Sequence, residues 1–241
     1  MRNASEVRAC RLGRLSGFCV PPADPKLRRC AISADALSYA ETWQEETSEL
    51  AAARRRGQEL GTPSPSSISA ATLAVLAAAV GAKAVVEVGT GVGVSGLRLL
   101  EGMKPDGILT TIDADANHQN AARAAFREAG IDASRARQIT GSPDEVLPRL
   151  ADAAYDLVVV NDPGPDPQPY LDQALRLLRD GGVVVVGSAL GKGNPVADVT
   201  KRDSKTLALR AAAKSIKDND ELLSVLLPFS DGILIAAKRP S

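Results

Sequence analysis

Three glycines at alternate positions lie between Glu87 and Ser95, in the stretch EVGTGVGVS. Glycines at positions 89, 91 and 93 allow the backbone to bend sharply and to approach a ligand closely. A helix that begins after this bend would offer free N–H groups and positive dipole to an anionic group. Glu87 ends an apolar run, where a buried carboxylate needs a cation or hydrogen-bond donors beside it. The stretch therefore predicts a site for a ligand that carries both a carboxylate and an ammonium group, whose carboxylate meets Ser95.

A second acid, Asp113, ends the next apolar run, 20 residues after Gly93. An acid at that position can accept both hydroxyl groups of a ribose. Ser142, in the stretch TGSPDE, follows the third run and is expected near an adenine. An amino-acid end at Glu87 and a nucleoside end at Asp113 describe S-adenosylmethionine, although Asp113 alone would also suit NAD. The alternatives are a helix N-cap for Asp113 and a simple turn or cap for Ser142.

The fourth apolar run, YDLVVV, stops abruptly at Asn161–Gly164, which is a polar segment of turn-forming residues. In α/β proteins the active site lies where parallel strands end in this way. Asp162 is the candidate general base, with Lys192 and Asp198, in the long loop after the fifth strand, as further candidates. The alternative is a β-turn without a chemical role. The single histidine, His118, is expected to be a surface residue at the outer edge of the cofactor site.

These residues lie between strand-like and helix-like segments that alternate along the chain. The expected strands are 84–89, 107–113, 136–140, 155–160, 183–187, 221–229 and 232–238. The expected helices are 35–60 (one helix or a pair), 67–82, 94–103, 114–130, 143–150, 169–182 and 204–218. Apolar strands separated by helices predict an α/β fold, with a doubly wound, Rossmann-like parallel sheet. The last two strands are joined by a tight turn and must be antiparallel, because a parallel return needs a long crossover.

The first 33 residues differ from the rest. They hold seven basic residues against two acidic ones and no sustained periodicity, which predicts a disordered basic tail. All three cysteines, at positions 10, 19 and 30, fall there, and we expect reduced thiols in a cytoplasmic protein. Residues 34–241 are expected to form a single domain with an N-terminal helical segment at 35–81. The chain has 29 basic and 29 acidic residues and no apolar run of membrane-spanning length, so neither nucleic acid nor membrane is an expected partner.

The motifs, taken together and in order, resemble the catechol/caffeoyl-CoA O-methyltransferase-like family of class I methyltransferases, in its actinobacterial branch. The similarity covers about residues 35–241. It rests on AVVEVGTGVGVSGLRLL, GILTTIDADANHQNAARAAFREAG, GSPDEVLPRL, YDLVVVND, ALRLLRDGGVVVV and LLPFSDGILIAAK. The resemblance implies a seven-stranded sheet with its last strand antiparallel, S-adenosylmethionine as cofactor, a small-molecule methyl acceptor and a homodimer.

The glycine bend and the resemblance together give a set of expected cofactor contacts. They are Pro65, Glu87, Gly89, Thr90, Gly91, Gly93, Ser95, Asp113, Ala114, Ser142, Pro143 and Asn161.

The resemblance also implies a divalent metal site, from which this sequence departs. Members of the family carry an Asp at the end of strand 4, a Lys three residues later and an Asp-Asn pair after strand 5. This chain has Asn161, Gly164 and the pair Gly187-Ser188 at those positions. Hard cations prefer several oxygen ligands with carboxylate charge, so no divalent metal is expected here. Compensation by Asp162 and Asp166, through a shift of one residue, is the alternative.

The expected function is therefore S-adenosylmethionine-dependent O-methylation of a small molecule without the divalent metal of the family. A methyltransferase-like protein that binds the cofactor but has lost catalysis is the alternative. A nicotinamide-dependent oxidoreductase is disfavoured by Glu87 and by the final antiparallel strands.

Overall fold

The computed structural model describes residues 33–161 and 163–240. The basic tail with its three cysteines and the candidate base Asp162 therefore fall outside the described residues, apart from Ser33. The chain divides into two compact units, Met1–Tyr39 and Ala40–Ser241. The first unit ends within helix α1 (Ala34–Glu41), and the second contains the sheet and the candidate site. No helix in the described segments is long and apolar enough to cross a membrane.

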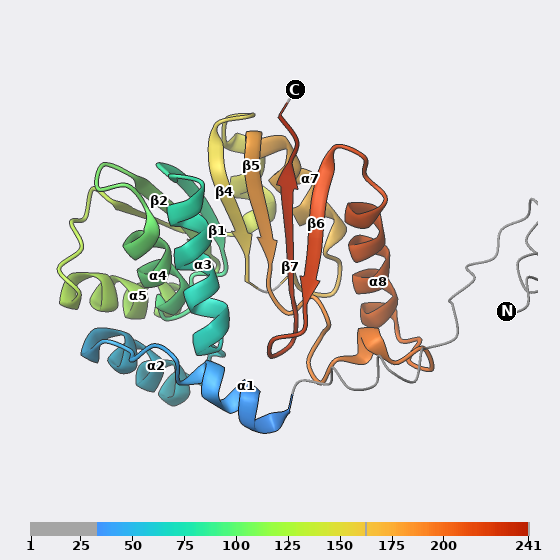
Figure 1. The fold of residues 1–241 in the computed structure, drawn as a ribbon. Coiled ribbons are helices and arrows are strands. Elements are labelled where there is room, and N and C mark those ends of the chain that lie inside the picture. The colour runs from blue at the N-terminus through green and yellow to red at the C-terminus, as the bar shows by residue number, and fades with distance from the viewer. Residues whose placement is uncertain (1–32, 162, 241) are drawn as a thin grey trace, which may run out of the picture. The chain divides into compact units, whose positions relative to one another are not determined.

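The centre of the second unit is a seven-stranded sheet in the order β3-β2-β1-β4-β5-β7-β6 (Figure 1). Strands β1 to β5 run parallel, whereas β7 is antiparallel to both β5 and β6, so the predicted fold class is confirmed. The strands are β1 (Ala84–Val88), β2 (Ile108–Asp113), β3 (Ala136–Thr140), β4 (Tyr155–Val160), β5 (Leu178–Val186), β6 (Leu222–Leu227) and β7 (Ile233–Lys238).

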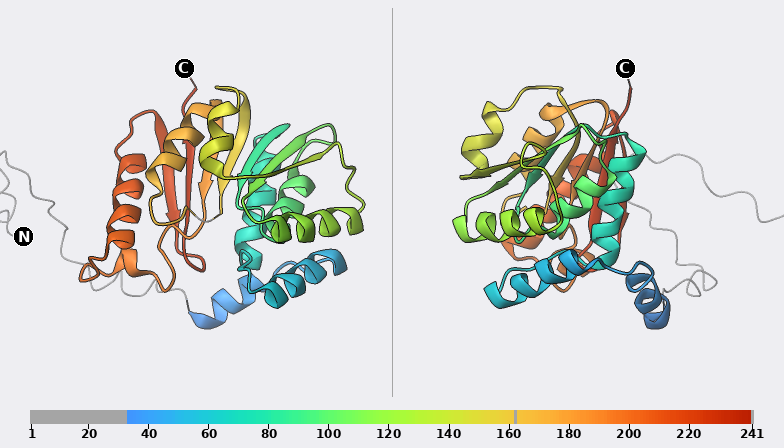
Figure 2. Two further views of the ribbon diagram at one scale, coloured as in Figure 1. Left: turned by 180° about the vertical axis from the view of Figure 1, so that it is seen from behind. Right: turned by 90° about the vertical axis from the view of Figure 1, so that its left-hand side faces the viewer.

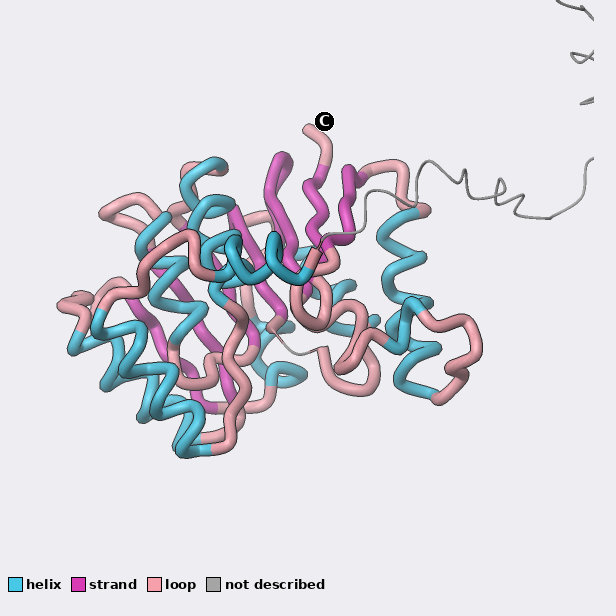
Figure 3. The backbone as a smooth tube through the Cα atoms, turned by 60° about the horizontal axis from the view of Figure 1, so that its bottom comes forward, coloured by secondary structure: helices cyan, strands magenta, loops and turns pink. Residues whose placement is uncertain are grey.

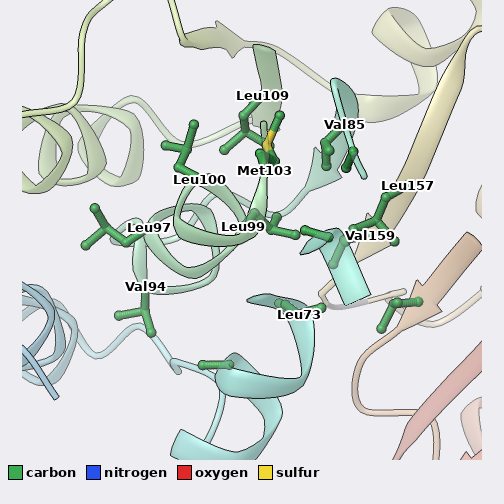
Figure 4. Close-up of a cluster of buried hydrophobic side chains, with 14 of the residues drawn as sticks. Leu73, Val85, Val94, Leu97, Leu99, Leu100, Met103, Leu109, Leu157 and Val159 are labelled. Atoms are coloured by element: carbon green, nitrogen blue, oxygen red, sulfur yellow. The ribbon is translucent and has the colours of Figure 1, made fainter. Parts of the chain in front are cut away.

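Helices cover the two faces of this sheet (Figures 2 and 3). The helices of this unit are α2 (Ser48–Leu60), α3 (Ser67–Ala79), α4 (Val94–Gly102), α5 (Ala116–Glu128), α6 (Pro143–Val146), α7 (Gln168–Leu177) and α8 (Ser204–Lys217), with short 3₁₀ turns η2 (Leu147–Arg149) and η3 (Pro195–Ala197). Side chains of α3 and α4 share one apolar cluster with alternate strand residues (Figure 4), and α5 contributes to the same cluster. The remaining alternate residues form a second cluster with α7 and α8. This alternation assigns Val85 to the first cluster and Val86 to the second, as the period of a strand requires.

Residues 35–60 form a pair of helices, which is one of the two predicted arrangements, and Thr47 begins α2 by accepting a hydrogen bond from the backbone N–H of Leu50. One helix boundary differs from the sequence prediction. The predicted helix 169–182 ends at Leu177, because Leu178 is already extended and pairs with Tyr155 of β4. The residues between Leu178 and Val183 form an irregularity that contains Gly181 in the left-handed region, so apolar periodicity alone extended the helix too far.

Helices α3 and α4 approach each other at Gly102, and this contact restricts the residue type. A Cβ atom added to Gly102 would lie 2.0 Å from the carbonyl oxygen of Ala74. Because that oxygen belongs to helical backbone, it cannot move aside as a flexible side chain could.

We expect Gly102→Ala to lower the free energy of unfolding by about 3 kcal/mol, because α3 and α4 must separate to admit the methyl group. Gly61→Ala is the comparison, since a Cβ there meets nothing within 4 Å and only the left-handed backbone, at φ +67°, opposes it. That conformation costs about 1 kcal/mol for an L residue. Urea denaturation of both variants measures the difference, and equal losses would contradict the helix contact.

Candidate active site

A cavity of about 270 Å³ lies at the carboxyl ends of the parallel strands, where the turn between β6 and β7 also arrives. Its wall combines the loop between α2 and α3, part of α3, the strand ends and the β6–β7 turn. The lining residues are Thr62, Pro63, Ser64, Pro65, Ser69, Leu73, Gly89, Gly91, Asp113, His118, Val159, Asn161, Val185, Gly187, Ser188, Phe229, Ser230, Asp231, Gly232 and Ile233.

Glu87 lies behind this cavity, fully buried near the end of β1. Its Oε2 accepts a hydrogen bond of 2.6 Å from the Thr111 hydroxyl, and its Oε1 accepts one of 3.0 Å from Asn161 Nδ2. Burial is the largest cause that raises the pKa of Glu87, and hydrogen bonds from Ser95, Thr111 and Asn161 oppose it. The nearby negative charge of Asp113 contributes in the same direction as burial, and the resulting pKa is about 7. A cation placed next to Glu87 would favour its ionised form.

Asn161 connects Glu87 to the glycine bend and to the first turn of α4. Its Nδ2 also lies 2.8 Å from the carbonyl oxygen of Gly89 and 3.0 Å from Ser95 Oγ. The side-chain amide has two N–H groups for three acceptors, so the three contacts share them. Asn161 thus joins residues from β1, the bend and α4 at one point beside the cavity.

The glycine bend has the backbone that the sequence predicts. Gly89, Gly91 and Gly93 have φ values of +86°, +51° and +90°, in the region that disfavours side chains. The bend comes close to α5, since a Cβ on Gly93 would lie 3.1 Å from Ala122 Cα. The Gly91 N–H donates a hydrogen bond of 2.9 Å to Asp113 Oδ2, which links the bend to the end of β2.

Asp113 lines the cavity and is not the N-cap of the next helix, because Asp115 occupies that position. Its Oδ1 accepts a hydrogen bond from the backbone N–H of Asp115. His118 Nδ1 lies 3.2 Å and 3.3 Å from the two carboxylate oxygens, and His118 Nε2 lies 2.8 Å from Thr62 Oγ1. The expectation that His118 is only a surface residue is therefore wrong. The first turn of α5 places it beside the strand end from which the helix departs, with a side chain that is 26% exposed.

The other expected cofactor contacts lie at different depths. Pro65, Gly89, Gly91, Asp113 and Asn161 line the cavity. Ser95 and Thr90 are buried behind it, at 2% and 1% exposure. The Thr90 hydroxyl contacts Thr111 Oγ1 at 2.6 Å and accepts from Gln119 Nε2 at 2.9 Å, so it supports the bend from inside.

The adenine-side candidates lie outside the cavity lining. Ala114 is exposed, and Ser142 begins α6, with Pro143 as the first residue of that helix. Ser142 makes no side-chain capping bond there, so the simple cap does not account for its hydroxyl. The sequence did not single out Thr62 or the β6–β7 turn as part of the site. No local motif marks them, because they reach the cavity only through the fold.

The positions at which the family holds a metal do not fit a hard cation here. Asn161 directs its amide nitrogen, which is a donor, toward Glu87 and Gly89. Gly187 has no room for a side chain, since a Cβ there would lie 2.6 Å from the Asn161 carbonyl oxygen. Within residues 33–161 and 163–240, no group of three or more His, Cys, Asp or Glu side chains could hold a metal ion.

The raised pKa of Glu87 gives the stability of the fold a dependence on pH. The folded state holds the Glu87 proton up to about pH 7, whereas the unfolded chain loses it near 4.5. The contribution that protonated Glu87 makes to the free energy of unfolding is therefore fully present below pH 4.5 and is lost as the pH rises through about 7. Glu87→Gln cannot ionise at this position. We expect its free energy of unfolding, relative to that of the wild type, to rise by about 3 kcal/mol when the pH is raised from 5 to 8. Urea denaturation at both pH values measures this change. A difference between variant and wild type that stays constant with pH would contradict a raised pKa.

Comparison with known proteins places the chain in a family. A family model described as O-methyltransferase matches residues 36–239. A protein of Mycolicibacterium vanbaalenii that carries the name O-methyltransferase is 47% identical over 221 residues, which cover 91% of this chain and 96% of the relative. A relative of the same name from Mycolicibacterium smegmatis is 45% identical and covers 86% of this chain and 99% of its own length.

Solved structures agree with this placement. A crystal structure of a protein from Corynebacterium glutamicum has a TM-score of 0.78 and 34% identity, and covers 85% of this chain and 95% of its own. The O-methyltransferase TomG of Streptomyces achromogenes, solved in complex with S-adenosylmethionine, has a TM-score of 0.76 and 26% identity, and covers 86% and 97%. The chain belongs to the O-methyltransferase family.

Proposed function

We propose that this protein transfers a methyl group from S-adenosylmethionine to an oxygen atom of a small molecule, without a divalent metal. The observation that carries the proposal is the pair of acids at the two ends of the glycine bend. Glu87 is buried behind the cavity, and Asp113 lines it. A ligand with an ammonium group at one end and a sugar diol at the other complements both acids.

The methionine end of the cofactor would lie between Glu87 and the beginning of α4. Its ammonium group compensates the buried carboxylate of Glu87, which lacks any ion pair in the described residues. Its carboxylate meets the free N–H groups of α4. Ser95, in the first turn of α4, lies at the same place. Asp113 would accept from the ribose hydroxyls, and Ala114, Ser142 and Pro143 remain the proposed neighbours of the adenine.

The acceptor would occupy the opposite side of the cavity. Apolar side chains from β4, β5, α3 and the β6–β7 turn line this side: Leu73, Val159, Val185, Phe229 and Ile233. Ser188, Ser230 and Asp231 are the polar members of this wall. A compact acceptor with an apolar body and a free hydroxyl group fits this lining better than a large or strongly anionic one.

Methyl transfer to oxygen needs alignment of the two reactants and a destination for the hydroxyl proton. The cavity wall supplies the alignment by holding the donor at Glu87 and Asp113. Asp162 remains our proposed base, since it directly follows Asn161 in the chain. The alternative of a protein that binds the cofactor without catalysis rests on the replaced metal-binding positions, Asn161, Gly164, Gly187 and Ser188.

Turnover tests the proposal directly. Purified protein with labelled S-adenosylmethionine and a panel of phenols, flavonoids and thiols should release S-adenosylhomocysteine with at least one hydroxylated acceptor. The rate should be the same with added Mg²⁺ and with EDTA, because the described residues offer no carboxylate cluster for the ion. Cofactor binding without any turnover would favour the inactive alternative, and loss of activity in EDTA would refute the metal-free reaction.

We also propose a homodimer. Large apolar side chains are exposed at Trp43, at 72%, and at Val75 of α3, at 67%. Trp43 lies in the turn after α1 and not within the helix that the sequence predicts. Single exposed apolar residues are normal on a surface, so the measured mass in solution decides this proposal.

Light scattering at micromolar concentration should give twice the mass of one chain, because pairing would cover these side chains. Trp43→Ser should shift the measured mass toward that of one chain. A wild-type protein that is monomeric under these conditions would contradict the dimer.

A further inference from the structure

We propose that His118 is a positioning residue that couples closure of the loop Thr62–Pro65 to capture of the cofactor's ribose by Asp113. This inference rests on the proposed function, because it assigns Asp113 to the ribose. It adds a role for the one histidine of the chain, which lies outside the glycine bend.

The hydrogen bonds of His118 define which ring nitrogen carries the proton. Nδ1 faces both oxygens of the Asp113 carboxylate, at 3.2 Å and 3.3 Å, and a carboxylate only accepts. Nδ1 therefore carries a proton and donates a hydrogen bond to Asp113. Nε2 forms a hydrogen bond of 2.8 Å with the Thr62 hydroxyl. The ring thus forms a bridge from the end of β2 to the beginning of the loop.

The loop that begins at Thr62 lies against the glycine bend and forms part of the cavity wall. A Cβ atom on Gly91 would lie 3.7 Å from Thr62 Cγ2, which places the Thr62 methyl group over the bend. At the other end, the Pro65 carbonyl oxygen accepts a hydrogen bond of 2.5 Å from Arg54 Nη1. Arg54 is itself held by Glu46 through Nε, at 2.7 Å and 2.8 Å. The loop is thus fastened at both ends.

Both fastenings hold an expected cofactor contact, but they hold different parts of it. Arg54 fastens the backbone of Pro65 to α2. His118 fastens Thr62 to Asp113, the carboxylate that meets the ribose. Loss of the His118 bridge would remove the anchor of the Thr62 side chain, while the Thr62 backbone N–H would still donate to the Gly57 carbonyl oxygen. It would also remove one of the contacts that orient the Asp113 carboxylate, which would keep its hydrogen bonds from the backbone N–H groups of Gly91 and Asp115. Cofactor affinity then falls through both effects, while the β-sheet core remains as it is.

A double-mutant cycle on S-adenosylhomocysteine affinity tests this coupling. The proteins are wild type, His118→Ala, Thr62→Val and the double variant, measured by calorimetry. Each single change should weaken binding about tenfold, the usual effect of losing one hydrogen bond of this kind. The double variant should also be about tenfold weaker, because both changes break the same bridge. Asn120→Ala, an exposed position on α5, is the matched control and should bind as the wild type does.

A second measurement separates positioning from general support of the fold. An analogue of S-adenosylhomocysteine that lacks the 2′-hydroxyl should bind the wild type more weakly than the parent compound. His118→Ala should reduce this discrimination, because Asp113 is no longer oriented toward the diol. The unfolding temperature of each variant is recorded alongside, and Thr62→Val tests the same bridge from the loop side if His118→Ala is unstable.

The outcomes distinguish this inference from the function on which it rests. If the wild type binds S-adenosylhomocysteine and His118→Ala binds it with the same affinity, the bridge is overturned and the proposed function stands. Losses of about tenfold each that multiply to about a hundredfold in the double variant would do the same, since the two residues would then act independently. Absence of binding by the wild type would overturn both.

Discussion

The buried carboxylate of Glu87 is the constraint on which the site depends. A carboxyl group without solvent access must find hydrogen-bond donors, and here they come from three different elements. Thr111 belongs to β2 and pairs with Glu87 in the register of β1 and β2. Asn161 follows β4, and Ser95 lies in the first turn of α4. A shift of one residue in either strand pair would turn a donor to the opposite face of the sheet.

This arrangement makes binding and stability oppose each other. Desolvation dominates the environment of Glu87, and the surrounding donors only partly compensate it. A cationic group at the cavity would favour the ionised form of Glu87, so ligand binding would offset the cost of burying this carboxylate. Proteins commonly keep such destabilised groups where they are needed for function. The two acids also reinforce each other, since the Asp113 charge is one reason why Glu87 resists ionisation.

The sequence predicted the part of the site that local pattern determines. Glu87 and Asp113 each lie near the end of an apolar strand, so the strand pattern alone predicted that they lie at the carboxyl ends of the parallel strands. His118 and Thr62 are 56 residues apart and meet only because α5 and the loop after α2 lie beside the same strand end. No local spacing encodes that meeting. The sequence predicted that strand β5 begins at Val183, whereas it begins at Leu178, for a related reason. Leu178 continues the apolar period of α7 but pairs with β4.

The exchange of an acid for an amide at Asn161 connects the chemistry of the reaction to the charge of Glu87. A carboxylate accepts hydrogen bonds only, whereas the amide nitrogen of Asn161 donates to Glu87 Oε1 at 3.0 Å and to the Gly89 carbonyl oxygen at 2.8 Å. An ionised Asp in the same conformation would face two acceptors and repel Glu87, so it would have to turn away, toward a cation. The amide supplies Glu87 with a donor instead, without a second negative charge beside it. A neutral side chain at this position agrees with the metal-free methyl transfer that we propose.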